Sequence, residues 1–121
     1  MITDATAAAG LPMGAQARLG GQSITVGEWA AFLADGTLAG SVMTLDRMLR
    51  TLVRQMDVPL VDAVTMCSTT PARELGLAGY GLVAEGAMAD LVVLDPELSV
   101  VQTYVAGRLV YARNTAAHSS V

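Results

Sequence analysis

Few residues of this chain could do chemistry, and Asp4 is the most prominent of them. It is the one acid in an otherwise small and apolar stretch. An aspartate in such a place is either a turn or cap residue, which is the commoner case, or a carboxylate at the end of a buried strand, where barrel enzymes carry catalytic groups. Composition leaves both interpretations open. Cys67 falls on an apolar helical face with Leu60 and Val64, so burial is its expected role.

A hydrolytic metal site needs several His, Cys or carboxylate ligands that converge on one point. This chain has one His and one Cys, so neither residue type can form a cluster within one copy. His118 lies beside Ser119 and Ser120 near the end of the chain, where we expect a frayed tail rather than a ligand or a catalytic base. The glycines of residues 77–86 indicate turns, because their spacing does not match a phosphate-binding loop.

The composition is unusually apolar for an independent domain. Apolar residues make up 53% of the chain, charged residues only 15%, and the mean hydropathy is +0.50. A small globule has proportionally more surface to keep polar, so these values indicate a fragment with faces that something else covers. No stretch reaches the ~18 apolar residues of a membrane span. The seven basic residues are scattered and the net charge is −4, which argues against nucleic-acid binding.

The elements that must position Asp4 can be expected from periodicity. Residues 18–33 alternate like a β-hairpin with Gly20-Gly21 in its turn, and Asp35-Gly36 closes this region. Ser41 or Thr44 can cap a following helix. Its apolar stripe would consist of Leu45, Leu49, Leu52, Val53 and Met56. Asp46 and Arg50 would form an i,i+4 pair on its outer side.

The second half of the chain predicts helices followed by strands. Pro59 suits the first turn of a helix that runs to about Ser68, and Thr70-Pro71 restarts a third helix that Gly76 ends as a left-handed cap. Residues 91–94, 100–105 and 109–111 predict a three-strand meander. The order of a strand, a hairpin, helices and a meander predicts an α/β protein.

Four stretches carry a family resemblance when they are taken in order and spacing. They are TDATAAAG at residues 3–10, DGTLAGS at 35–41, STTPARELGL at 68–77 and GAMADLVVL at 86–94. Together they resemble the N-acetylglucosamine-6-phosphate deacetylases of the amidohydrolase superfamily, over residues 3 to about 110. The last two motifs are shared across amidohydrolases and would also fit a dihydroorotase-like or aminoacylase-like enzyme. The first two in combination are narrower and favour the sugar-phosphate deacetylase.

The resemblance implies the C-terminal part of a (β/α)8 TIM-type barrel together with strands of a small β-sandwich. Residues 1–85 would be the end of the barrel domain, with the last barrel strand, a hairpin insertion and the C-terminal helices. Residues 86–113 would be β-sandwich strands, and residues 114–121 a tail. On this map Asp4 ends the eighth barrel strand, and Leu38, Ala39 and Gly40 belong to a substrate-contacting loop. A simple lead-in to the helix is the alternative for these three residues.

The resemblance also implies a reaction, the hydrolysis of N-acetylglucosamine 6-phosphate to glucosamine 6-phosphate and acetate. A residue matching Asp4 would take the proton of a metal-bound water and deliver it to the departing amine. The family holds one divalent metal, often zinc or iron, through a Glu and two His that have no counterpart in this chain. We therefore expect this chain to bind no metal and to be inactive by itself, although Asp4 would lie next to the metal in the whole enzyme.

Two other functions stay open, the C-terminal part of another amidohydrolase and a non-catalytic module that associates with itself. A last barrel strand without its neighbours has unpaired edges, which invite pairing with a second copy. We therefore expect self-association or a homo-oligomer, and no nucleic-acid or membrane partner. A single cysteine excludes an internal disulfide and favours a reducing, cytoplasmic location.

Overall fold

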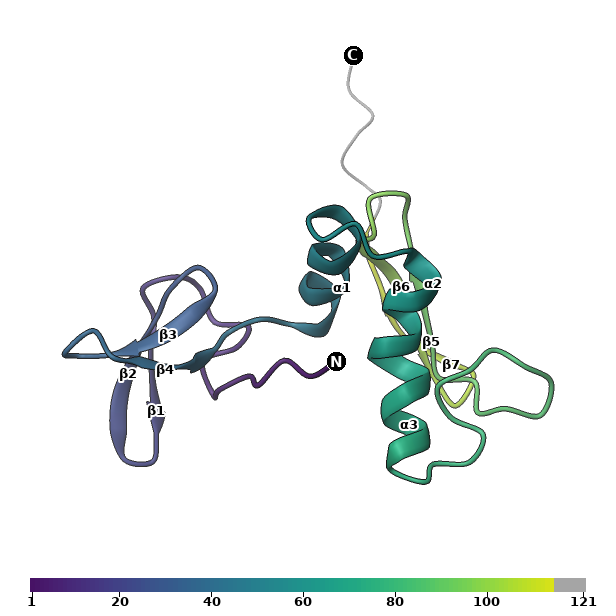
Figure 1. Cartoon of the computed structure of the whole chain (residues 1–121), viewed down its shortest axis with the longest axis horizontal. Helices are drawn as coiled ribbons and strands as arrows, with labels where there is room; N and C mark the ends of the chain where they lie inside the picture. The colour runs from purple at the N-terminus through teal and green to yellow at the C-terminus, as the bar shows by residue number, and fades with distance from the viewer. Residues whose placement is uncertain (115–121) are drawn as a thin grey trace, which may run out of the picture. The chain divides into compact units, whose positions relative to one another are not determined.

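The computed structural model describes residues 1–114, which divide between two compact units, residues 1–56 and residues 57–114 (Figure 1). Residues 57–85, which contain the helical segments between Leu60 and Glu74, fall in the same unit as the final strands. The expected domain boundary between residues 85 and 86 therefore does not coincide with the division into compact units, and it stays a prediction.

The first unit is built on a four-stranded antiparallel sheet. Its strands, in spatial and chain order, are β1 (Gln16–Leu19), β2 (Gln22–Val26), β3 (Ala30–Leu33) and β4 (Leu38–Ser41). Leu19 pairs with Gln22, and both glycines between them have positive φ, as a tight two-residue hairpin turn requires. The expected hairpin is thus confirmed. Residues 38–40, which we expected in a loop, instead lie in the edge strand β4.

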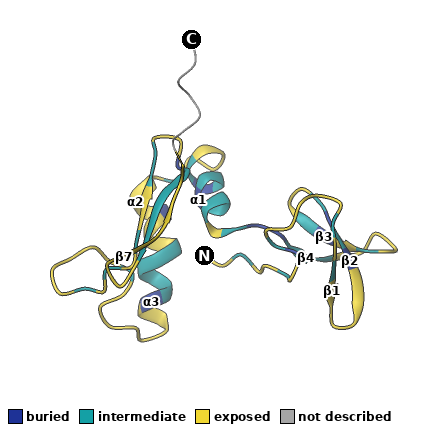
Figure 2. Cartoon of the chain, turned by 180° about the vertical axis from the view of Figure 1, so that it is seen from behind, coloured by how far each residue is buried: buried dark blue, intermediate teal, exposed yellow. Residues whose placement is uncertain are grey.

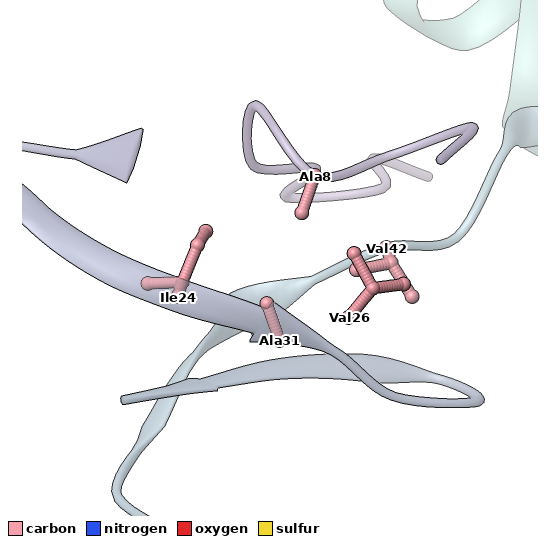
Figure 3. Close-up of a cluster of buried hydrophobic side chains, with 5 residues drawn as sticks. All are labelled: Ala8, Ile24, Val26, Ala31 and Val42. Atoms are coloured by element: carbon pink, nitrogen blue, oxygen red, sulfur yellow. The ribbon is translucent and has the colours of Figure 1, made fainter. Parts of the chain in front are cut away.

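A small apolar cluster holds this sheet to the first residues of the chain. Ile24 and Val26 alternate onto one face of β2, and Ala31 of β3 and Val42 join them. Ala8 is fully buried and points from the N-terminal loop toward the sheet (Figure 3). The loop at residues 7–10 therefore closes the core of this unit.

Helix α1 (Leu45–Arg54) buries only part of the expected apolar stripe. Leu49 and Leu52 are buried, but Leu45 is 44% exposed and Met56, beyond the helix end, is 63% exposed. The Asp46–Arg50 pair is confirmed, with 2.8 Å between the carboxylate and the guanidinium.

Thr44 occupies the N-cap position of α1, but its side chain makes no cap hydrogen bond. Partial burial raises the pKa of Asp46, but the hydrogen bonds from Thr44 and Arg50 outweigh burial and leave this pKa below its usual value.

The second unit opens with one uninterrupted helical segment made of α2 (Leu60–Val64), the π-helical η1 (Thr65–Thr69) and α3 (Thr70–Glu74). The expected start at Thr70 is confirmed, but the expected break before it is absent. The Thr70 N–H donates to the Thr65 carbonyl five residues back, and this wider turn accommodates Pro71, which lacks an N–H of its own.

Gly76 ends this segment as expected. Its φ is +68°, its N–H donates to the Arg73 carbonyl at 3.0 Å, and the next N–H, of Leu77, donates to the Ala72 carbonyl at 2.9 Å. This pair of bonds is the Schellman arrangement of a left-handed helix cap.

The final strands β5 (Leu91–Leu94), β6 (Val100–Val105) and β7 (Arg108–Ala112) form the expected antiparallel meander. Asp95 fixes the first turn, because its carboxylate accepts from the Ser99 N–H and from Arg113, each at 2.8 Å. Every residue of β7 is exposed (Figure 2). In the part of the chain that the structure describes, no helix is long and apolar enough to span a membrane. The predicted tail lies outside the described residues except for Asn114, so His118 does too.

The turn between β6 and β7 predicts a stabilising substitution. Ala106 adopts a left-handed conformation, with φ of +49°, and precedes Gly107. Asparagine tolerates this conformation better than alanine, so Ala106→Asn should raise the free energy of unfolding by about 0.5–1 kcal/mol. Ala106→Val should lower it, because a β-branched residue is strained there. Both variants keep the backbone N–H that donates to Asp90 at 2.7 Å. Chemical denaturation followed by circular dichroism tests the pair, and a common direction of change would contradict the argument.

Candidate active site

The two motifs that favour the sugar-phosphate deacetylase, residues 3–10 and 35–41, lie next to each other in the first unit. Ala5 and Ser41 form a parallel bridge, although they are far apart in the sequence. The Thr6 N–H donates to the Ser41 carbonyl at 2.9 Å, and the Ser41 N–H donates to the Asp4 carbonyl at 3.3 Å. The chain around Asp4 therefore runs alongside β4.

Asp4 itself is exposed and its backbone is left-handed, with φ of +49°. It stands in a short irregular connection beside a single bridge, not within a strand. Within residues 1–114, no hydrogen bond or ion pair engages its carboxylate. The main chain alone fixes its place, and the carboxylate is open to a water molecule or a substrate.

Gly40 allows the close approach of these two segments. Its φ is +142°, and a Cβ at this position would lie 2.5 Å from Cγ2 of Thr6 and 3.8 Å from the Asp4 carbonyl oxygen. A side chain at residue 40 would have to displace Thr6, so glycine is required here for both space and conformation.

The other two predicted substrate contacts are placed differently. Leu38 is 65% exposed, whereas Ala39 packs against the apolar cluster around Ile24. The structure therefore brings Gly40 next to the Asp4 segment and leaves only Leu38 with a freely accessible side chain. The role of these three residues in binding a substrate stays a prediction.

The turn before β4 is held by Asp35. Its carboxylate accepts from the Thr37 N–H at 2.9 Å. This hydrogen bond, with a further one from the Thr37 side chain, holds the pKa of Asp35 below its usual value. The ionised carboxylate thus orders the turn that leads into Leu38.

The residue that sequence reasoning missed is Thr6. Its hydroxyl donates to the Ser41 carbonyl at 3.1 Å and accepts from the Ala8 N–H at 3.3 Å. Thr6 stands inside the TDATAAAG stretch, but threonine beside an apolar run has no distinctive spacing. Only its pairing with a residue 35 positions away shows what its side chain contacts.

The described residues do not fit the divalent-metal centre that the resemblance implies for the whole enzyme. Between residues 1 and 114, no three His, Cys, Asp or Glu side chains gather closely enough to share an ion. Asp4 would contribute a single carboxylate, and a hydrolytic metal site needs several ligands. Cys67 is half-buried, and burial raises the pKa of its thiol, which fits packing better than ligation.

A sequence model of the amidohydrolase family matches residues 24–110, most of the chain, and the chain belongs to this family. An N-acetylglucosamine-6-phosphate deacetylase from Lysinibacillus sphaericus is 40% identical over 90% of this chain and 28% of its own length. An N-acetylgalactosamine-6-phosphate deacetylase from Escherichia coli O157:H7 is 37% identical over 90% of this chain and 29% of its own length.

A solved structure of a deacetylase also matches this chain. An aspartate-to-alanine mutant of the N-acetyl-D-glucosamine-6-phosphate deacetylase from Mycobacterium smegmatis, in complex with N-acetyl-D-glucosamine-6-phosphate, is 41% identical. It matches with a TM-score of 0.74 over 89% of this chain and 29% of its own. The resemblance inferred from the four motifs is thereby confirmed. The chain spans less than a third of the length of these relatives.

The contact between Gly40 and Thr6 generates a prediction about stability. Gly40→Ala should lower the free energy of unfolding by about 2 kcal/mol or more, because it adds both backbone strain and a clash. Thr6→Ser removes the clashing methyl and should recover part of this loss in the double variant. Gly36→Ala is the matched control, since Gly36 has φ of +83° but a Cβ added there would meet no atom within 4 Å. Equal losses in the two alanine variants, measured by denaturation, would show that the close approach is not the constraint.

Proposed function

We propose that this chain supplies the proton-transferring carboxylate and part of the substrate site of a deacetylase. The reaction is hydrolysis of N-acetylglucosamine 6-phosphate to glucosamine 6-phosphate and acetate. The observation that supports the proposal is the backbone pairing of the Asp4 segment with β4 through Ser41, because it holds the main chain of Asp4 next to the strand that carries the predicted substrate contacts. The names of the relatives from L. sphaericus and M. smegmatis support the substrate.

The role of Asp4 follows from the needs of amide hydrolysis. Water adds to the acetyl carbonyl carbon, the C–N bond breaks, and the departing amine must receive a proton. A carboxylate that first accepts a proton from the water can return it to the amine. The Asp4 carboxylate is exposed and without a partner among the described residues, so it is available for both transfers.

Amidohydrolases generally use a divalent metal, which activates the attacking water when it is bound. The described residues do not provide the ligands of this metal, so we assign none of them a role in metal binding. We infer that one zinc or iron ion would be held by residues outside this chain. In the same assembly, residues 1–85 would form the end of a (β/α)8 barrel and residues 86–113 would belong to a small β-sandwich.

A second substrate is N-acetylgalactosamine 6-phosphate, favoured by the relative from E. coli O157:H7. The two sugars differ only in the configuration of the C4 hydroxyl. Of the three predicted contacts, Leu38 is the one with an accessible side chain, and its isobutyl group offers no hydrogen bond to that hydroxyl. The choice between the sugars therefore has to be measured with both substrates.

Self-association and a cytoplasmic location also stay predictions. Large apolar side chains are exposed in both units, for example Leu38 at 65%, Val61 at 77% and Val83 at 88%. Such surfaces are normally covered by another element or partner. Analytical ultracentrifugation over a range of concentrations measures whether a second copy covers them.

A chimaera tests the role of Asp4. This chain would replace the matching segment of the L. sphaericus relative, to which it is 40% identical over 109 residues. In an active chimaera, Asp4→Asn should lower kcat for acetate release by about 10²–10⁴-fold, since asparagine cannot accept the proton. Asp62→Asn is the matched control, because Asp62 is an exposed aspartate of the other unit and lies in none of the four motifs. Retention of full activity by Asp4→Asn would remove the basis of the proposed function.

The isolated chain should release no acetate from N-acetylglucosamine 6-phosphate, with or without added zinc or ferrous iron. The physical reason is the missing ligand set, which leaves Asp4 without an activated water. The measurement is a coupled acetate assay, with the chimaera as the positive control. Turnover by the isolated chain that Asp4→Asn abolishes would show that these residues suffice, contrary to expectation.

A further inference from the structure

Asp4 depends on its neighbours for its position. Its carboxylate is held by no hydrogen bond within residues 1–114, and its φ of +49° is uncommon for a residue with a side chain. Such a conformation persists only where surrounding contacts enforce it. The orientation of the carboxylate therefore follows from whatever anchors the main chain on either side.

The anchors converge on Ser41. On one side, its N–H donates to the Asp4 carbonyl at 3.3 Å, which is a long hydrogen bond. On the other side, its carbonyl accepts from Thr6 twice, from the backbone N–H at 2.9 Å and from the hydroxyl at 3.1 Å. The hydrogen bonds made by Thr6 are the shorter ones. Thr6 therefore contributes most to holding the main chain around Asp4.

The Thr6 hydroxyl links three parts of the chain. A hydroxyl can donate once and accept as well, and this one donates to Ser41 while it accepts from the Ala8 N–H at 3.3 Å. Ala8 is fully buried in the apolar cluster. The hydroxyl thus connects the Asp4 segment to β4 and to the residue that closes the core.

The two branches of the Thr6 side chain have separate contacts. Its hydroxyl makes the hydrogen bonds, and its methyl fills the space beside Gly40, where a Cβ would come within 2.5 Å. Serine retains the first branch and valine mimics the second. Substitution can therefore separate the hydrogen bonds from the packing.

We propose that Thr6 is a positioning residue, whose hydroxyl holds the Asp4 carboxylate where proton transfer requires it. This inference rests on the proposed function. Misplacement of a reacting group by about 1 Å can lower a rate by about 10²-fold. Loss of the hydroxyl should therefore lower kcat, whereas KM should change little because β4 and the substrate contacts expected on it keep their sequence.

The experiment uses the active chimaera described above. Thr6→Val should lower kcat at least about 10-fold with KM within about twofold, and Thr6→Ser should restore kcat to within about threefold of the parent. Thr69→Val is the matched control, because the Thr69 hydroxyl also donates to a carbonyl, that of Gly81 at 2.6 Å, and lies in the other unit. It should lower the melting temperature comparably while kcat is unchanged. Thr6→Ala compared with Thr6→Ser repeats the test without the methyl, in case the valine variant does not fold.

The outcomes separate the inference from the function on which it rests. If Thr6→Val loses no more kcat than Thr69→Val, or if Thr6→Ser is as impaired as Thr6→Ala, the hydroxyl has no positioning role. If either result occurs while Asp4→Asn is inactive, only the inference about Thr6 is overturned. If Asp4→Asn is fully active, the proposed function fails and the role of Thr6 fails with it.

Discussion

The Ser41 carbonyl and the two Thr6 groups that donate to it form the interaction on which the first unit depends. The first ten residues contain no strand, only a bridge at Ala5. Without these hydrogen bonds, Ala8 would not be held in the apolar cluster and the main chain at Asp4 would not have a fixed position. A local hydrogen-bond pattern at one edge of a sheet thus determines both the packing of a core and the geometry of a candidate active site.

Elements with strong local signals could be predicted from the sequence. The Gly20-Gly21 turn, the meander at the end of the chain and the cap at Gly76 each depend on a residue whose conformational preference is marked. Strand β4 was missed because Leu38, Ala39 and Gly40 show no clear apolar alternation. The continuous helix was missed because proline normally ends or kinks a helix, and nothing local announces a π turn that accommodates it.

The candidate site also has one residue that the sequence could identify and one that it could not. Asp4 could be found only through the resemblance of its surrounding motif, because an aspartate near small residues is more often a turn residue. Thr6 could not be found at all, since its role depends on the bridge between Ala5 and Ser41, a single non-local pairing. The exposure of Leu45 and Met56 was missed because periodicity identifies a helical face but not how far a partner covers it.

The π turn at Thr65–Thr69 also sets the rotational phase of the helix in which it lies. Ala63 and Ala72 are both buried, and regular α-helical pitch, at about 100° per residue, would direct them about 180° apart. One extra residue absorbed in the wider turn reduces this angle to about 80°. The two alanines can therefore contribute to one buried side of a single rod. If one residue were removed from this turn, the helix would have regular α-helical pitch throughout, and the two alanines would still lie about 80° apart around its axis.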